Sequence, residues 1–74
     1  MGWSYNRLWV QLINKGMNRG ELREATGITT GTLAKLGKNQ PVAMTVLGRI
    51  CHALNCRLED IVEYVPDSTE DQNN

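Results

Sequence analysis

The sequence predicts an all-α fold, a bundle of five short helices followed by a polar tail. Apolar residues recur at helical spacing in five segments, capping residues, glycine or proline separate those segments, and no strand pattern of weight appears. The chain has 74 residues, 41% hydrophobic and 22% charged, which suits one globular domain. We therefore expect residues 1–66 to form the domain and residues 67–74 to form an acidic, disordered tail.

The first helix is expected to begin after Ser4, a good N-cap residue, and to end at Gly16. Its apolar stripe has the i, i+3, i+4, i+7 spacing of an amphipathic helix and consists of Tyr5, Leu8, Trp9, Leu12 and Ile13. We interpret Trp9 as a core residue, whereas Trp3 either covers the core or joins a partner chain.

The second helix is short and is expected from Arg19 to Ala25 or Thr26. Asn18 and Glu21 have the spacing of a capping box at its start. Leu22 and Ala25 are predicted to face inward, and Gly27 to end the helix in a left-handed turn.

Thr29 is the expected cap of a third helix, from about Thr30 to Gly37, whose buried side carries Leu33 and Leu36. The segment that follows is predicted to be a loop, because Pro41 disfavours helix at the residue before it.

A fourth helix is expected at about Met44 to Asn55, with one apolar stripe made of Val46, Leu47, Ile50, Cys51 and Leu54. A short fifth helix is predicted from the apolar residues Leu58, Ile61, Val62 and Val65, and Pro66 stops it.

Composition excludes several classes of function. No apolar run approaches the roughly 20 residues of a membrane span and none resembles a signal peptide, so we expect a soluble, cytoplasmic binding module. Two cysteines and one histidine (Cys51, Cys56 and His52) make neither a disulfide framework nor a closed zinc site. No nucleophile–base pair is evident, so we expect no catalytic residues, no metal, no cofactor and no small-molecule substrate.

The charges are segregated along the chain although the formal net charge is zero. Residues 1–57 contain all eight basic residues and only two acidic ones, a net charge of +6, and residues 58–74 contain six acidic residues, a net charge of −6. Because the local field steers a polyanion, a basic body with an acidic end is compatible with a nucleic-acid partner.

The second and third helices, joined through Gly27, have the features of a helix-turn-helix unit. Such a unit needs glycine in its turn and apolar anchors after it, and Gly27, Ile28 and Leu33 meet both demands. The outer face of the third helix must be slim enough for a groove about 12 Å wide and must carry hydrogen-bonding groups. The residues that meet this description are Thr30, Gly31, Thr32 and Lys35.

Taken together, these features make the chain resemble the Xre/Cro-like (lambda-repressor-like) helix-turn-helix family of bacterial and phage regulators. The resemblance covers about residues 4–66 and rests on three main stretches: residues 5–9 with 15–17, residue 22 with 25–29, and residues 32–39. Residues 46–47, 50–56 and 60–61 complete it. It implies a five-helix DNA-binding domain and a sequence-specific transcriptional regulator, with a repressor of bacterial, phage or mobile-element origin as the expected kind.

The resemblance also assigns site residues. Base edges would be contacted by Thr29, Thr30, Gly31, Thr32 and Lys35. The DNA backbone would be held by Arg19, at the start of the second helix, and by Lys38 and Asn39, in the loop after the third.

The expected partners are double-stranded DNA and a second copy of the chain, with half-sites about 10 bp apart. The dimer surface is predicted to use Leu58, Ile61, Val62, Tyr64 and Val65. An alternative is a protein-interaction adaptor or antitoxin-like partner with the same fold, which would bind duplex DNA weakly at any salt concentration. Two interpretations of the acidic tail stay open: it competes with phosphate for the basic face, or it only adds solubility.

Overall fold

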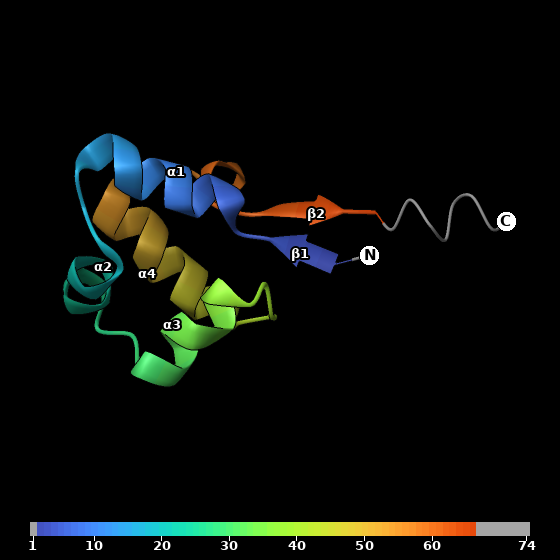
Figure 1. The fold of residues 1–74 in the computed structure, drawn as a ribbon, viewed down its shortest axis with the longest axis horizontal. Coiled ribbons are helices and arrows are strands. Elements are labelled where there is room, and N and C mark those ends of the chain that lie inside the picture. Colours follow the sequence, from blue (N-terminus) through green and yellow to red (C-terminus); the bar gives the residue numbers. More distant parts are fainter. Residues whose placement is uncertain (1, 67–74) are drawn as a thin grey trace, which may run out of the picture.

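The structure, a computed structural model, describes residues 2–66, so the predicted tail at 67–74 lies outside the described residues. Four α-helices, one 3-10 turn and two short strands are present in this part of the chain (Figure 1). In chain order they are β1 (Gly2–Ser4), α1 (Asn6–Lys15), α2 (Arg19–Thr26), α3 (Thr30–Gly37), α4 (Met44–Leu54), the 3-10 turn (Leu58–Asp60) and β2 (Glu63–Val65). The domain is therefore mostly helical, as predicted, with four α-helices rather than five.

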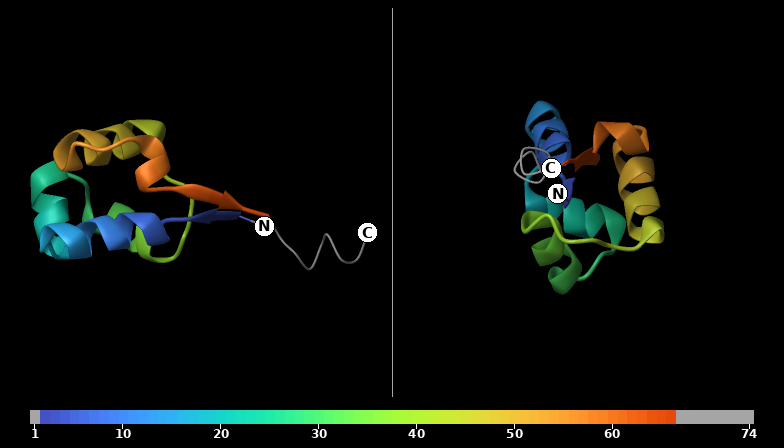
Figure 2. Two further views of the ribbon diagram at one scale, coloured as in Figure 1. Left: turned by 90° about the horizontal axis from the view of Figure 1, so that it is seen from above. Right: turned by 90° about the vertical axis from the view of Figure 1, so that its right-hand side faces the viewer.

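The prediction of a fifth helix is wrong. Its segment forms the 3-10 turn, at whose start the Asp60 carboxylate accepts the Arg57 N–H at 3.0 Å, and then β2. This strand pairs antiparallel with β1, Tyr64 opposite Trp3 and Glu63 opposite Ser4. Both strands extend together from one end of the helical body (Figures 1 and 2). The apolar spacing at 58–65 also suits a turn followed by a short strand, because Tyr64 and Val65 both favour extended backbone, and pairing with the distant N-terminal segment selects the strand.

Helix α1 begins one residue later than a Ser4 cap would require. Tyr5 occupies the N-cap position without a side-chain cap, while the Ser4 hydroxyl accepts the Asn6 N–H at 3.3 Å. Tyr5 is buried with Leu8 and Leu12, but Ile13 is 76% exposed, which contradicts its place on the buried stripe. A residue advances about 100° around a helix, and this step carries Ile13 past the edge of the stripe defined by Leu12.

Helix α2 packs against α3 and α4 and confirms the predicted caps. Asn18 and Glu21 form the reciprocal capping box, and Gly27 adopts a left-handed φ of 74°. Ala25, however, is exposed, and Thr26 takes the inward position instead. Its hydroxyl donates to the Leu22 carbonyl at 2.8 Å, so a polar side chain is buried with its hydrogen bond satisfied.

Helix α4 begins at Met44, as predicted, although Ala43 at its N-cap offers no side-chain hydrogen bond. The core is one cluster under all four helices, whose ten members are Tyr5, Leu8, Leu12, Leu22, Ile28, Leu36, Leu47, Ile50, Leu54 and Ile61. Ile61 is fully buried, so its predicted role on a dimer surface is wrong. Within residues 2–66 no helix is both long and apolar enough to cross a bilayer.

Candidate nucleic-acid interface

Helices α2 and α3 form the helix-turn-helix unit, with α3 at the edge of the molecule farthest from α1 (Figures 1 and 2). The Gly27 N–H donates to the Arg23 carbonyl at 2.8 Å, which closes the end of α2. Ile28 is 5% exposed and Leu36 is fully buried, so α3 is anchored at both ends. These anchors press one side of α3 onto the body and leave its outer side open.

The outer side of α3 consists of small or cationic residues. Five exposed positions share it: Thr30, Gly31, Ala34, Lys35 and Lys38. At about 100° per residue they cover an arc of about 140°. No large apolar or acidic side chain lies among them, so this face is narrow and positively charged.

Thr29 and Thr32 lie at the base of this face and bond to each other. The Thr29 hydroxyl accepts the Thr32 N–H at 3.1 Å and donates to the Thr32 hydroxyl at 3.0 Å. Thr29 is thus the N-cap of α3, as predicted, and Thr32 is half-buried. Among the side chains predicted to contact base edges, Thr30 and Lys35 are exposed. Within residues 2–66, neither of them forms a hydrogen bond with another side chain.

Arg19, the first residue of α2, lies beside two other helices. Its guanidinium carbon is 3.8 Å from the centroid of the Trp9 ring of α1. Its terminal nitrogen Nη1 would be 3.2 Å from a Cβ built on Gly37, the last residue of α3. The structure therefore holds the Arg19 cation where α1, α2 and α3 meet.

Lys38 and Asn39 follow α3 directly. Lys38 is exposed, and Asn39 has a left-handed φ of 58°. The Asn39 side-chain oxygen accepts the Tyr5 backbone N–H at 3.0 Å, and the Tyr5 hydroxyl donates to the Gln40 carbonyl at 2.8 Å. These two bonds fix the loop after α3 to the start of α1.

The electrostatic field is shaped by where the acidic residues lie. No Asp or Glu occurs between positions 25 and 58, a stretch that holds all of α3 and α4. At the other end, Arg7 pairs with Glu63 at 3.5 Å and donates to the Glu59 carbonyl at 3.1 Å. Part of the acidic segment is thereby neutralised locally, and α3 keeps its positive charge.

The sequence does not indicate that Trp9 and Gly37 lie beside the Arg19 guanidinium. Trp9 was interpreted as core, and it is half-buried against the core while one ring face meets Arg19. Gly37 was treated only as the end of the third helix. The available signal was Arg19 itself, since a cation at a helix start opposes the helix dipole and requires another stabilising contact.

The reactive side chains outside this face include Cys51 and Cys56. Both cysteines are free and half-buried, and burial, followed by the nearby Cys51, raises the pKa of the Cys56 thiol. A raised pKa keeps this thiol protonated and weakly nucleophilic at neutral pH. Residues 2–66 contain no group of three or more His, Cys, Asp or Glu placed to hold a metal ion.

Known proteins are similar to this chain in structure and in sequence. The crystal structure of the transcriptional regulator VanUg superposes with a TM-score of 0.87 at 53% sequence identity, and the match covers 89% of this chain and 88% of that chain. The uncharacterized HTH-type transcriptional regulator YozG of Bacillus subtilis (strain 168) is 40% identical over 60 residues, which are 78% of this chain and 71% of YozG.

A family model also matches most of the domain. It describes the Cro/C1-type HTH DNA-binding domain and matches residues 7–67, a range that includes α1 except its first residue, all of α2 to α4 and the 3-10 turn. Together with the exposed, cationic face of α3, these matches show that the chain belongs to the Cro/C1-type helix-turn-helix family of DNA-binding transcriptional regulators.

Proposed function

We propose that the protein is a sequence-specific repressor that binds duplex DNA as a homodimer and places α3 in the major groove. The observation that carries the proposal is the outer face of α3, which is narrow, cationic and free of large apolar and acidic side chains. An α-helix with such a face fits a groove about 12 Å wide and reaches base edges. A repressor of this kind acts by occupying DNA that the transcription machinery needs.

Within α3, we assign base readout chiefly to Lys35 and Thr30. Lys35 can donate to guanine O6 and N7, and the Thr30 methyl or hydroxyl can meet thymine or phosphate. Gly31 lets the helix backbone approach the groove, because it presents no side chain there. Thr29 and Thr32 contribute at the edge of the footprint, since their hydroxyls already bond to each other.

The DNA backbone contacts are assigned to Arg19, Lys38 and Asn39. Arg19 and Lys38 are exposed cations at the two ends of the helix-turn-helix unit, and the N-terminus of α2 adds its dipole. The Asn39 oxygen is occupied by the Tyr5 N–H, so its amide NH₂ group is the donor toward phosphate. These contacts set the register of α3 without reading sequence.

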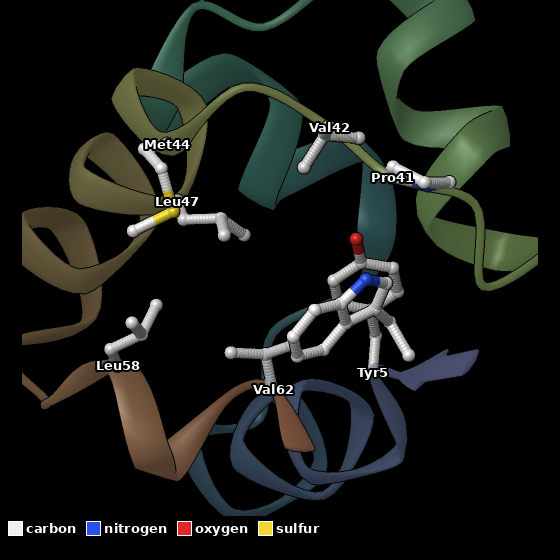
Figure 3. A pocket seen from close by; sticks show the side chains of 8 residues that line it. Tyr5, Pro41, Val42, Met44, Leu47, Leu58 and Val62 are labelled. Carbon is white, nitrogen blue, oxygen red and sulfur yellow. The ribbon is translucent and has the colours of Figure 1, made fainter. Parts of the chain in front are cut away.

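The homodimer is assigned to the end of the molecule that carries the sheet. An apolar hollow of about 290 Å³ opens there (Figure 3). It is lined by β1, by Tyr5 just before α1, by the loop between α3 and α4, by α4 and by the segment that contains Leu58 and Val62. Trp3, Leu58 and Val65 are between 40% and 46% exposed, and Met44 is 66% exposed. A domain this small rarely leaves so many large apolar side chains in water at one end, so a second copy is the proposed cover. A two-fold dimer would then read half-sites about 10 bp apart.

Selection of bound DNA from a random duplex pool tests the proposal. We expect one preferred, two-fold symmetric sequence for the wild type. Lys35→Ala and Thr30→Ala should each lose preference at particular bases, and Thr32→Ala should weaken binding more evenly. Enrichment of no sequence would contradict specific readout, and a reporter gene downstream of the selected site would show whether binding represses it.

A further inference from the structure

We infer that Trp9 and Gly37 form a seat that holds the Arg19 guanidinium in place for a DNA phosphate before DNA arrives. The inference deepens the proposed function and rests on it. The seat has two sides: the Trp9 ring face, 3.8 Å from the guanidinium carbon, and the bare backbone of Gly37 at the end of α3. Three helices therefore fix one cation that sequence alone would place on a flexible surface side chain.

Stacking leaves the hydrogen-bonding capacity of Arg19 intact. A guanidinium stacked on an aromatic ring uses its planar face, while its five N–H donors point outward in the plane. In residues 2–66 no hydrogen bond or ion pair engages these donors, and the Trp9 ring is the group with which the guanidinium interacts. Contact with the Trp9 ring thus orients the planar face of the guanidinium, and the N–H donors along its edge stay available. Two such donors side by side can bind a pair of phosphate oxygens.

The position of the seat also explains why a cation is tolerated at a helix start. Arg19 stands at the N-terminus of α2, where the helix dipole repels positive charge. Its terminal nitrogen lies beside Gly37, at the C-terminus of α3, where the dipole attracts positive charge. At the guanidinium, the attraction by the α3 dipole therefore offsets the repulsion by the α2 dipole, and the cation is stable at this position.

Gly37 keeps the seat open. A Cβ on this residue would lie 3.2 Å from the Arg19 Nη1 atom, a distance tighter than ordinary van der Waals contact. The atom that must give way is the far end of a flexible side chain, so alanine would move the guanidinium and not the fold. Gly37 is helical and lacks a positive φ, so alanine also suits its backbone.

The seat predicts a specific energetic role. A long side chain that is already ordered loses little conformational freedom when it binds phosphate, so pre-orientation raises affinity without adding a contact. Loss of the seat should therefore weaken binding by about three- to tenfold, the range expected for one immobilised side chain. If the phosphate contact is lost, the slope of the logarithm of the binding constant against the logarithm of the salt concentration should also become shallower by about 0.9.

The experiment compares Gly37→Ala with Gly48→Ala, the same change on α4 at a position where a Cβ meets no atom within 4 Å. In the free protein, NMR of the Arg19 side chain should show resonances shifted upfield by the Trp9 ring current. A Cβ at 3.2 Å from Nη1 displaces the guanidinium by a few tenths of an ångström, so we expect Gly37→Ala to reduce this shift and to lower the DNA affinity by up to about threefold, with an unchanged or raised melting temperature. Gly48→Ala should keep both the shift and the affinity.

Substitutions of the partners complete the test. Trp9→Phe preserves an aromatic face and should retain most of the affinity, whereas Trp9→Leu removes that face and should lose the NMR shift together with three- to tenfold in affinity. Arg19→Ala should cost less affinity in the Gly37→Ala background than in the wild type, because the seat and the cation act together. Unshifted Arg19 resonances in the wild type, or a displaced Arg19 with unchanged DNA affinity, would overturn the inference. A wild type that binds no duplex would instead contradict the proposed function, while the NMR shift would still report whether the seat forms.

Discussion

The helix-turn-helix unit and the sheet end of the molecule expose opposite kinds of surface. The outer face of α3 carries Thr30, Gly31 and Lys35, which are small or charged. At the sheet end, Trp3 packs edge-on against Tyr64 with ring centroids 5.1 Å apart, and Trp3 remains 46% exposed. The first surface suits a hydrated, charged polymer and the second suits an apolar protein surface.

The two regions also differ in how they are held. In the helix-turn-helix unit, caps a few residues away close each helix: Asn18 with Glu21, and Thr29 with Thr32. At the sheet end, β1 pairs with β2 across about 60 residues of sequence. Hydrogen bonds between residues close in sequence thus hold the cationic surface of the helix-turn-helix unit. Pairing between β1 and β2, which are far apart in sequence, holds the apolar surface at the sheet end. A domain of this size can therefore present two chemically different surfaces.

The largest expected effect comes from removing the anchor that presents α3. Leu36→Ala deletes a fully buried side chain and should lower the free energy of unfolding by about 2–5 kcal/mol, enough to unfold much of a domain this small. Urea denaturation measures it. The control is Ile13→Ala, a similar truncation at a side chain that is 76% exposed, for which we expect a change within about 0.5 kcal/mol. Equal losses in the two variants would contradict the assignment of the core.

The same contrast explains which parts of the fold the sequence predicted. The bounds of α2 and α3, the capping box and the turn at Gly27 follow from signals within a few residues, and the structure confirms them. The strands were missed because the pairing of Trp3 with Tyr64 is a tertiary contact that no local pattern reports. Apolar spacing at 58–65 satisfied a helix equally well, so the wrong element was chosen.

The candidate site shows the same limit. The sequence indicated which residues of α3 face outward, because helical periodicity separates Thr30 and Lys35 from Leu36. It did not indicate that the Thr29 and Thr32 hydroxyls bond each other, nor that Trp9 holds Arg19. Both facts depend on side-chain geometry and on how three helices meet, which periodicity does not contain.

The next effect concerns the apolar end alone. Leu58→Glu places a charge in the hollow of about 290 Å³ and should prevent a second copy from covering it. We expect a monomer by analytical ultracentrifugation and about a hundredfold weaker binding to a two-fold site, with binding to a single half-site unchanged. Val10→Glu is the control, because Val10 is 53% exposed and does not line the hollow. A dimer that survives Leu58→Glu would place the interface elsewhere.

A smaller effect distinguishes readout from attachment on the charged surface. Lys35→Ala should cost about 1–3 kcal/mol on the preferred site and relax the preference at one base pair, because it removes a donor to a base edge. Lys38→Ala should weaken binding to all duplexes alike, because Lys38 is assigned to the backbone. Affinities for the preferred site and for single-base variants of it check both. A uniform loss for Lys35→Ala would move Lys35 to the backbone contacts.

The smallest effect tests Tyr5, which lies where the two regions join. Burial raises the pKa of the Tyr5 phenol, so the folded protein holds this proton more tightly than the unfolded chain does. The resulting stability is fully present below about pH 10 and is lost as the pH rises through the higher folded pKa. Tyr5→Phe should cost about 1 kcal/mol at neutral pH, because the hydrogen bond to the Gln40 carbonyl is lost, and should flatten the alkaline decline.

The Cys56 thiol, whose pKa is also raised by burial, contributes a similar decline that begins at lower pH. Cys56→Ser separates the two groups, since it removes the earlier part of the decline and leaves the later part to Tyr5. Urea denaturation between pH 7 and pH 11 measures both variants against the wild type. If the free energy of unfolding of Tyr5→Phe falls as steeply above pH 10 as that of the wild type, the Tyr5 phenol does not cause this fall. Its bond to the Gln40 carbonyl would then not join the loop after α3 to the start of α1 as proposed.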